Sequence, residues 1–265
     1  MERIRDNIKL VAFDLDGTIY NGNKLITGAL EIIDFFKRKG KKICFFTNNS
    51  SLSRDQIFDK LLGFSIDLCV SDVYCCSYAI PFFLRKENYK SIFIIGSSTL
   101  SDEVSKSGIN VTNEIADNNV DALLIGLDAD FNYTKLARAY ETLQRNKLCK
   151  IIVCNMDSNF PVENGLRKPG CGSIVSSILF ASDRRIDFMI GKPDPFILDM
   201  IGKENNVLPK NILVIGDSFD SDIQMANNLN AHSILIDNIG IINSQRKITV
   251  SCLSEIDKIY NDYYI

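Results

Sequence analysis

The sequence predicts an α/β fold in which helices cover both faces of parallel sheets. Apolar runs of strand length recur along the 265 residues, and segments with helical periodicity separate most of them. Such alternation is typical of parallel sheets, because a parallel pair of strands needs a crossover connection, usually a helix. Hydrophobic residues make up 46% of the chain and charged residues 24%, so the chain can bury a sizeable core.

The expected elements are taken in chain order. Short apolar runs predict strands at Ile8–Leu15, Ile43–Phe46, Ser91–Ile95, Ala122–Leu127, Ile151–Cys154, Phe188–Ile190, Ile212–Ile215 and Ser233–Ile236. Helical periodicity predicts helices at Ala29–Lys39, Arg54–Leu62, Tyr133–Arg145, Ser173–Phe180, Phe196–Asn205 and Asp222–Asn228. Glycines supply stops and turns around several of them, at Gly28, Gly40, Gly63 and Gly170.

Charge and cysteine usage limit the partners and the compartment. Thirty basic and thirty-three acidic residues give a formal charge of −3, so no overall positive field attracts nucleic acid or an acidic membrane. No apolar run approaches the ~20 residues of a membrane span, and the charged start Met1–Asp6 lacks a signal-peptide pattern. The eight cysteines form no CxxC pair, which favours buried thiols in a reducing compartment. We therefore expect a cytoplasmic protein.

Polar motifs follow four of the expected strands. Asp14 ends the first strand, and Thr47 and Asn48 end the second. Lys192 follows Phe188–Ile190, and Asp217 follows Ile212–Ile215. Because sheets of this kind bind ligands at the carboxyl ends of their strands, we expect these groups to converge on one cleft.

The first motif carries two carboxylates, Asp14 and Asp16, where a strand opens into a turn. An ionised carboxylate can attack phosphorus, but phosphate is negatively charged, so a cation must offset the repulsion. Mg²⁺ suits this task because it binds a few carboxylates together with substrate oxygens and water. The alternative is an ordinary strand end followed by an Asp-Gly turn.

The other three motifs can serve the same chemistry. The hydroxyl, amide and backbone N–H groups of Thr47, Asn48 and Asn49 can receive phosphoryl oxygens, although a plain loop before a helix is the alternative. Lys192 can offset phosphate charge or can be a solvated loop lysine. In the acidic segment after the strand Ile212–Ile215, Asp217 is the expected third metal carboxylate. Asp222 is expected to support the metal-binding residues without binding the metal itself.

These motifs together resemble the haloacid dehalogenase superfamily, whose pattern is DxDGT, a strand-end Thr or Ser, a distant Lys and a GD-containing acidic segment. The resemblance implies a Rossmann-like parallel-sheet core. It also implies that Asp14 is the nucleophile and Asp16 the general acid and base. Mg²⁺ is then held by Asp14, the Asp16 backbone carbonyl and Asp217, and phosphate by Thr47, Asn48, Asn49 and Lys192.

The long stretch between Thr47 and Lys192 predicts an inserted α/β cap domain of the second-position (C2) type. The expected divisions are core 1–88, cap 89–186 and core 187–265. Five segments resemble the family of NagD and of the 4-nitrophenyl, phosphoglycolate and pyridoxal-phosphate phosphatases: Thr47–Ser50, Ile125–Asp128, Asn155-Met-Asp157, Pro169–Gly172 and Gly191–Pro193. Phe160 stands where the vitamin-B6 phosphatases tend to carry histidine, which argues against pyridoxal phosphate. Four residues of the cap loop are open to two interpretations, substrate contact or ordinary packing: Asp157, Phe160, Arg167 and Lys168.

The resemblance implies a Mg²⁺-dependent phosphatase that hydrolyses small phosphate monoesters through an aspartyl-phosphate. Candidate substrates are nucleoside monophosphates, sugar phosphates, phosphoglycolate and 4-nitrophenyl phosphate. The partner is then a small phosphorylated metabolite and no nucleic acid or membrane, with a homodimer as a possibility. A catalytically weak binding or scaffold protein is the alternative from another class, and its signature would be a missing Asp14, Asp16, Lys192 or Asp217. All four are present.

Overall fold

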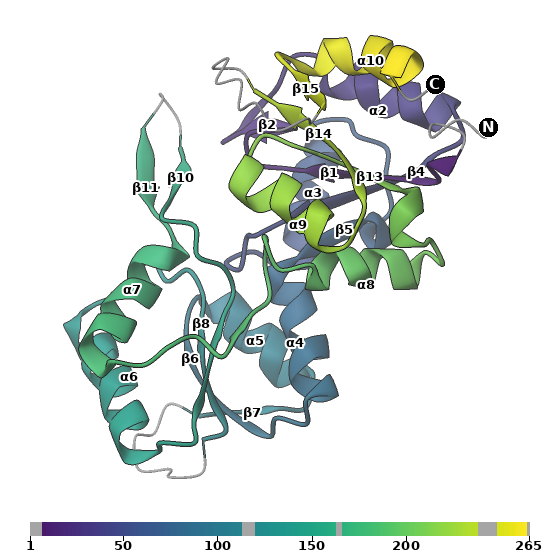
Figure 1. Ribbon diagram of the computed structural model, residues 1–265. Helices are drawn as coiled ribbons and strands as arrows, with labels where there is room; N and C mark the ends of the chain where they lie inside the picture. The colour runs from purple at the N-terminus through teal and green to yellow at the C-terminus, as the bar shows by residue number, and fades with distance from the viewer. Residues whose placement is uncertain (1–6, 113–119, 163–165, 238–247, 264–265) are drawn as a thin grey trace.

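Two parallel sheets, one above the other in Figure 1, organise the chain. The computed structural model describes residues 7–112, 120–162, 166–237 and 248–263. The segment Met1–Asp6, which we expected to lack a targeting signal, lies outside these residues. Within them, no helix is both long enough and apolar enough to cross a membrane.

The first sheet has six strands in the order β15-β14-β13-β1-β4-β5, and every neighbouring pair is parallel. Its strands are β1 (Leu10–Asp14), β4 (Lys42–Thr47), β5 (Val73–Cys75), β13 (Ile212–Gly216), β14 (His232–Ile236) and β15 (Ile248–Val250). All five residues of β1 are buried, because both of its neighbours are strands and helices cover both faces. This central position brings the end of β1 to the middle of the sheet edge.

Side chains of β1 alternate between two clusters of buried apolar residues, as the two-residue period of a strand requires. Val11 and Phe13 belong to the cluster formed with α2 (Ala29–Arg38), α3 (Arg54–Gly63) and α10 (Ile256–Tyr263). Leu10 and Ala12 belong to the other cluster, formed with α4 (Cys76–Lys86), α8 (Phe196–Glu204) and α9 (Gln224–Asn228). The sheet is therefore fixed between two helical layers.

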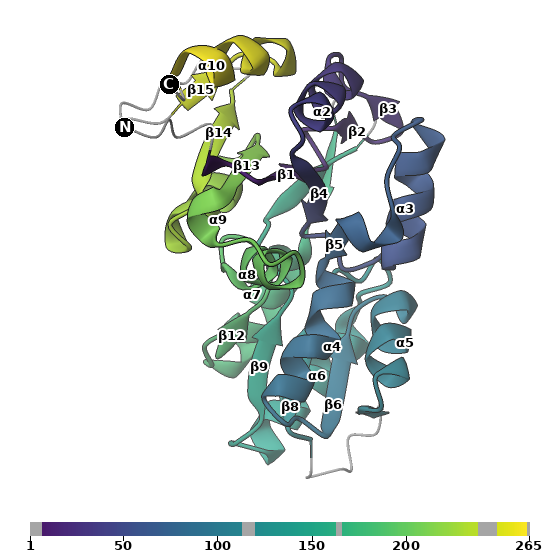
Figure 2. The same ribbon diagram turned by 90° about the vertical axis from the view of Figure 1, so that its right-hand side faces the viewer.

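The second sheet has the order β12-β9-β8-β6-β7 and is also parallel throughout. It contains β6 (Ser91–Ile95), β7 (Asn110–Thr112), β8 (Ala122–Ile125), β9 (Lys150–Val153) and β12 (Phe188–Met189). Its helices are α5 (Ser98–Lys106), which packs against α4, and α6 (Tyr133–Arg145), which packs against α7 (Cys171–Ser182) (Figure 2). Because β12 pairs with β9, this sheet runs past residue 186, where we expected the insertion to end. The division into domains stays a prediction.

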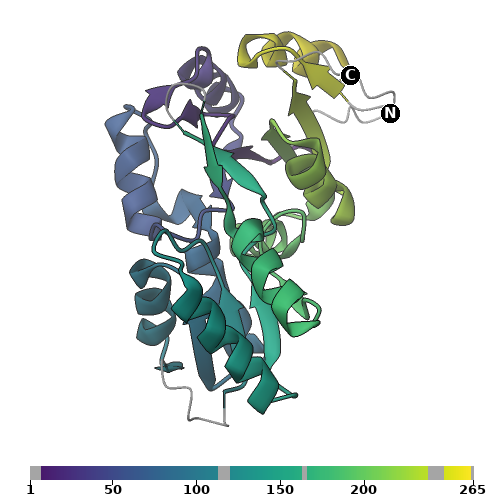
Figure 3. The same ribbon diagram turned by 90° about the vertical axis from the view of Figure 1, so that its left-hand side faces the viewer.

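Two small hairpins complete the architecture. β2 (Tyr20–Asn21) pairs with β3 (Lys24–Leu25) just after the Asp14–Gly17 turn. β10 (Asn159–Pro161) pairs with β11 (Arg167–Pro169). This hairpin extends from the part of the molecule that contains the second sheet toward the first sheet in Figures 1 and 3. The hairpin thus reaches the edge at which the strands of the first sheet end.

Most expected elements are present with small shifts at their ends. The expected helix Asp222–Asn228 is a π-helical turn, Phe219–Ile223, followed by α9. All eight cysteines are free thiols, but Cys69 is exposed and Cys252 half-buried, so the expectation of buried thiols is wrong for these two.

Candidate active site

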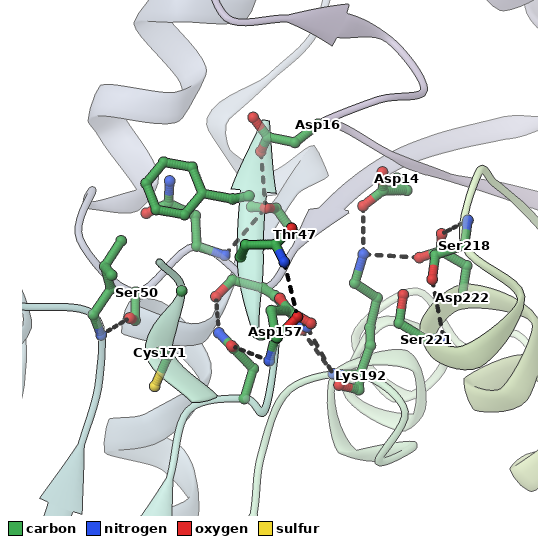
Figure 4. Close-up of a pocket in the computed structure, with 18 of the residues that line it drawn as sticks. Asp14, Asp16, Thr47, Ser50, Asp157, Cys171, Lys192, Ser218, Ser221 and Asp222 are labelled. Carbon is green, nitrogen blue, oxygen red and sulfur yellow. Dashed lines mark hydrogen bonds and ion pairs between the residues drawn. The ribbon is translucent and has the colours of Figure 1, made fainter. Parts of the chain in front are cut away.

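The carboxyl ends of β1, β4 and β13 meet at one edge and line a cavity of about 390 Å³ (Figure 4). Asp14 is the last residue of β1, Thr47 is the last of β4, and Asp217 directly follows β13. Lys192 lies in the segment that returns from the second sheet. The structure therefore brings together the four strand-end motifs that the sequence placed far apart.

Three carboxylates converge in this cavity. Asp14, Asp217 and Asp222 each offer one oxygen, and the three oxygens lie within 4.8 Å of one another. Asp14 and Asp222 are buried, whereas Asp217 is open to solvent. A set of hard oxygen donors at this spacing fits Mg²⁺. Asp222, which we expected only to support the metal-binding residues, therefore lies in the same cluster as Asp14 and Asp217.

Gly17 makes the room for this cluster. Its backbone has φ +99°, and a Cβ atom added there would lie 2.2 Å from Oδ2 of Asp217. A side chain at position 17 would therefore push Asp217 out of place.

Lys192 is buried between two of the carboxylates. Its Nζ donates to Oδ1 of Asp14 at 2.5 Å and to Oδ1 of Asp222 at 2.8 Å (Figure 4). Burial alone would lower the pKa of Lys192, but the two carboxylates more than offset this and raise its pKa well above the ordinary value. Asp222 also accepts a hydrogen bond from the backbone N–H of Ser218 at 3.0 Å. The lysine is thus held as an ammonium ion beside Asp14.

Burial dominates the acidity of the carboxyl groups. It raises the pKa of Asp14 well above the ordinary value, against the opposing charge of Lys192. Asp217 is reached by solvent, but the protein atoms around it displace part of its water. This desolvation, together with the charge of Asp222, raises the pKa of Asp217 to about 6. Negative charge is thus crowded here, and a cation in the cluster would relieve it.

Asp16 lies at the same cavity but makes a different set of contacts. Its Oδ2 accepts a hydrogen bond from Oγ1 of Thr47 at 3.4 Å, and an isolated β-bridge places Tyr20 beside Asp16. Burial raises the pKa of Asp16, while the nearby charge of Lys60 opposes the rise. Sequence reasoning missed Tyr20 and Lys60, because neither belongs to a polar motif at a strand end.

The side chains of the two asparagines after β4 bind other parts of the protein. Asn48 accepts from the backbone N–H of Lys192 at 2.7 Å and donates to Oδ2 of Asp157 at 3.0 Å. Asn49 accepts from the backbone N–H groups of Ser51 and Leu52. Both residues line the cavity, but their amide oxygens are already engaged in holding the loop and the cap. Their role as phosphate ligands stays a prediction.

The cap contributes part of the cavity wall. Asp157, Phe160 and Arg167 line it, together with Asn155, whose amide donates to the Asn48 carbonyl at 2.8 Å. Lys168 is absent from the described residues that line the cavity, and it neighbours Arg167 on β11. Of the four cap-loop residues singled out from the sequence, three therefore face the cavity. The sequence marked Asn155 only as part of the family resemblance. Its contact with Asn48 could not be predicted, because the two residues are 107 positions apart in the chain.

Comparisons with known proteins agree with this geometry. Residues 11–110 match the haloacid dehalogenase-like hydrolase profile, and residues 189–245 match a second, HAD-hydrolase-like profile. The sugar-phosphatase AraL of Bacillus subtilis is 30% identical over 227 residues, covering 85% of this chain and 82% of that protein. The chain belongs to the haloacid dehalogenase-like hydrolases.

Solved structures of this superfamily have the same architecture. The 4-nitrophenylphosphatase of Thermotoga maritima has a TM-score of 0.86 and 27% identity, covering 97% of this chain and 99% of that one. The glycerol phosphate phosphatase of Mycobacterium tuberculosis, in complex with magnesium, shares the fold with a TM-score of 0.84 and 23% identity, covering 97% of this chain and 79% of that one. Other relatives carry the names of phosphoglycolate and glycerol-3-phosphate phosphatases.

Proposed function

We propose that this haloacid dehalogenase-like hydrolase is a Mg²⁺-dependent phosphatase that hydrolyses small phosphate monoesters through a phosphorylated Asp14. One observation carries the proposal: the oxygens of Asp14, Asp217 and Asp222 lie within 4.8 Å of one another, beside the ammonium group of Lys192. A buried carboxylate flanked by a cation and by a set of metal-binding oxygens has what attack on a phosphate requires. The phosphatases among its relatives support the same reaction class.

Asp14, Asp217 and the backbone carbonyl of Asp16 would hold the metal. When bound, Mg²⁺ supplies positive charge that offsets the repulsion between the carboxylates and a phosphoryl group. Asp222 already accepts hydrogen bonds from Lys192 and from the backbone of Ser218, so it orients the lysine. The remaining N–H of the Lys192 ammonium group would donate a hydrogen bond to a phosphoryl oxygen.

The reaction has two displacements. In the first, a carboxylate oxygen of Asp14 bonds to phosphorus while the bond from phosphorus to the leaving oxygen breaks, and Asp16 gives its proton to that oxygen. In the second, Asp16 takes a proton from a water molecule, the water oxygen bonds to phosphorus, and the bond to Asp14 breaks to release inorganic phosphate. Burial raises the pKa of Asp16, which suits a carboxyl group that must carry a proton in the first step.

The substrate is a small metabolite, because the cavity of about 390 Å³ is walled by the cap residues Asp157, Phe160 and Arg167. We also propose a cytoplasmic location, since all eight cysteines are free thiols. A homodimer stays a prediction, and Phe180, which is 94% exposed on α7, is an apolar side chain that a partner could cover.

A phosphate-release screen with Mg²⁺ tests the proposal. The substrates are nucleoside monophosphates, sugar phosphates, phosphoglycolate, glycerol phosphate, 4-nitrophenyl phosphate and pyridoxal phosphate. We expect release from several of the first five and little from pyridoxal phosphate. Absence of release from every ester, by a protein shown to be folded and to bind Mg²⁺, would favour the binding or scaffold alternative.

A further inference from the structure

The side chain of Asn48 joins the cap loop to the segment that carries Lys192. Its Oδ1 accepts from the backbone N–H of Lys192 at 2.7 Å, and its Nδ2 donates to Oδ2 of Asp157 at 3.0 Å (Figure 4). The same Nδ2 donates to the carbonyl of Lys192 at 3.3 Å. One amide group of the core therefore holds the backbone of Lys192 on one side and a carboxylate of the cap on the other.

The partners of this amide fix the way in which it faces. A backbone N–H needs an acceptor and a carboxylate needs a donor, so Asn48 satisfies both Lys192 and Asp157 in one orientation. Asn48 is 7% exposed and Lys192 is 6% exposed. Because a buried polar group without a partner costs free energy, the loss of one of these contacts is expected to shift the groups around it.

Asp157 is held firmly within the cap. Its backbone N–H donates to Oδ1 of Asn155 at 3.0 Å, and its carbonyl accepts from the N–H of Gly172, at the start of α7, at 3.0 Å. A Cβ atom added to Gly170 would lie 2.2 Å from that carbonyl oxygen, so the loop packs tightly against the start of α7. The position of Asp157 therefore follows the position of the cap.

The backbone and the side chain of Lys192 are also closely packed. The N–H of Gly191 donates to the carbonyl of Cys154 at 2.7 Å, and a Cβ atom added to this glycine would lie 2.5 Å from Oδ1 of Asn48. The Lys192 side chain is 7% exposed, and its Nζ reaches Oδ1 of Asp14. Because close packing leaves such a side chain little room to compensate, a shift of its backbone is passed on to its ammonium group.

We propose that Asp157 is a positioning residue which, through Asn48, sets the place of the Lys192 ammonium group, so that the fit of the cap on the core controls how the phosphoryl group is bound. The proposal rests on the proposed phosphatase function, in which Lys192 binds a phosphoryl oxygen. Asp157 acts through Asn48 and not by contact with the leaving group. Its effect should therefore be the same for every ester, because all esters present the same phosphoryl group to Lys192.

Two substitutions of Asp157 separate its hydrogen bond from its charge. Asp157→Asn keeps an oxygen that can accept from Asn48, whereas Asp157→Leu has a similar size and no acceptor. For Asp157→Leu we expect kcat/KM to fall by about 10-fold, the effect of losing one hydrogen bond to a charged group. The factor should be equal for sugar phosphates, glycerol phosphate and 4-nitrophenyl phosphate, and the inhibition constant of inorganic phosphate should rise with it. Asp157→Asn should keep most of the activity.

Hydrogen exchange measures the same coupling without catalysis. The backbone N–H of Lys192 donates to Asn48, so its exchange with deuterium reports whether this contact is kept. In Asp157→Leu the peptide that contains Lys192 should exchange faster than in the wild type. In Asp157→Asn its exchange should be close to that of the wild type.

Ser97→Ala is the matched control. Ser97 lies in the segment expected to form the cap, and its Oγ donates to the carbonyl of Ser50 in the core at 3.3 Å. It also caps α5, but it is absent from the described residues that line the cavity. Ser97→Ala should therefore lower the melting temperature and leave both kcat/KM and the exchange at Lys192 unchanged.

The outcomes separate this proposal from the proposed function. Unchanged kcat/KM in folded Asp157→Leu, or an equal loss in Ser97→Ala, would overturn the role of Asp157. A loss confined to some of the esters would overturn it as well, because it would show direct contact with the substrate. A wild type that releases phosphate from no ester would instead remove the proposed function, and the exchange at Lys192 would still test the contact with the cap.

A second pair of variants covers the case in which Asp157→Leu does not fold. Asn48→Asp keeps an acceptor for the N–H of Lys192 but sets a second carboxylate against Asp157, so kcat/KM should fall. Adding Asp157→Asn supplies an amide donor from the cap side and should restore part of the loss. A double variant no more active than Asn48→Asp alone would overturn the role of Asp157.

Discussion

Gly17 lies directly against Asp217: a Cβ atom added to the glycine would be 2.2 Å from Oδ2 of that aspartate. Gly17→Ala should therefore displace Asp217 and lower kcat/KM by about 10²-fold, the effect of a misplacement near 1 Å. The affinity for Mg²⁺ should fall with it. Both are measured by phosphate release and by magnesium titration of the folded variant.

Strain at a left-handed backbone must be separated from this displacement. Gly108 provides the control, because it has φ +85° and a Cβ atom added there meets nothing within 4 Å. Alanine at either position should cost about 1–2 kcal/mol of folding free energy. If Gly108→Ala lost activity as Gly17→Ala does, the crowding against Asp217 would not be the cause.

Lys192→Met removes the ammonium group between Asp14 and Asp222. We expect kcat to fall by about 10²–10³-fold, as when one donor to a developing anion is lost, because a phosphoryl oxygen loses its positive partner. Two buried carboxylates are then left without a cation, so Mg²⁺ should raise the melting temperature more in the variant than in the wild type. Lys203→Met is the control, since Lys203 pairs with Asp199 on the exposed face of α8. Near-normal turnover by Lys192→Met would contradict its role.

The sequence predicted the core of the site because each group sits where an apolar run ends. Asp14, Thr47 and Asp217 follow strands that meet at one edge, so their convergence is a property of parallel sheets. The contacts of Asn48 could not be found in this way. Its amide binds Lys192, 144 residues away, and Asp157, 109 residues away, and no periodicity encodes such pairs.

The helices and strands that the sequence did not predict were missed for physical reasons as well. α4 carries Pro81 and buries seven of its eleven residues, so it shows no clear polar face to give a helical period. β5, β7 and β15 have three residues each, too few for a strand pattern to stand out. Tyr20 was missed because its place beside Asp16 comes from a β-bridge and from the packing of its ring against Lys60 and Phe64, which no local pattern encodes.

The hairpin β10–β11 gives a test of substrate choice, because Arg167 lines the cavity and its neighbour Lys168 does not. Arg167→Ala should change the order in which the enzyme prefers its substrates and leave the requirement for Mg²⁺ intact. Lys168→Ala, with the same loss of charge one residue away, should preserve the order. KM values across the panel of esters provide the measurement, and an order unaffected by Arg167→Ala would place specificity in the core.

Chelation tests the carboxylate cluster directly. Activity should disappear in excess EDTA and return with Mg²⁺, because Asp14, Asp217 and Asp222 otherwise repel the phosphate that they must meet. Ca²⁺ should inhibit, since its larger and more flexible coordination suits an in-line displacement poorly. Full turnover in EDTA would remove the metal assignment, and equal rates with both ions would count against the octahedral geometry.

Asp14 and Asp16 are two residues apart, line the same cavity and are proposed for different roles. Asp14→Asn keeps the shape of the side chain but removes the nucleophile, so no phosphoenzyme should form and turnover should fall to background. Asp16→Asn keeps its backbone carbonyl and loses the proton shuttle, so we expect a fall of about 10²–10⁴-fold on alkyl phosphates. With 4-nitrophenyl phosphate the first step should suffer less, and phosphate should accumulate on Asp14 because no base activates water. Rapid-quench trapping of labelled phosphate in the wild type and both variants measures this, and label retained by Asp14→Asn would show that another residue is the nucleophile.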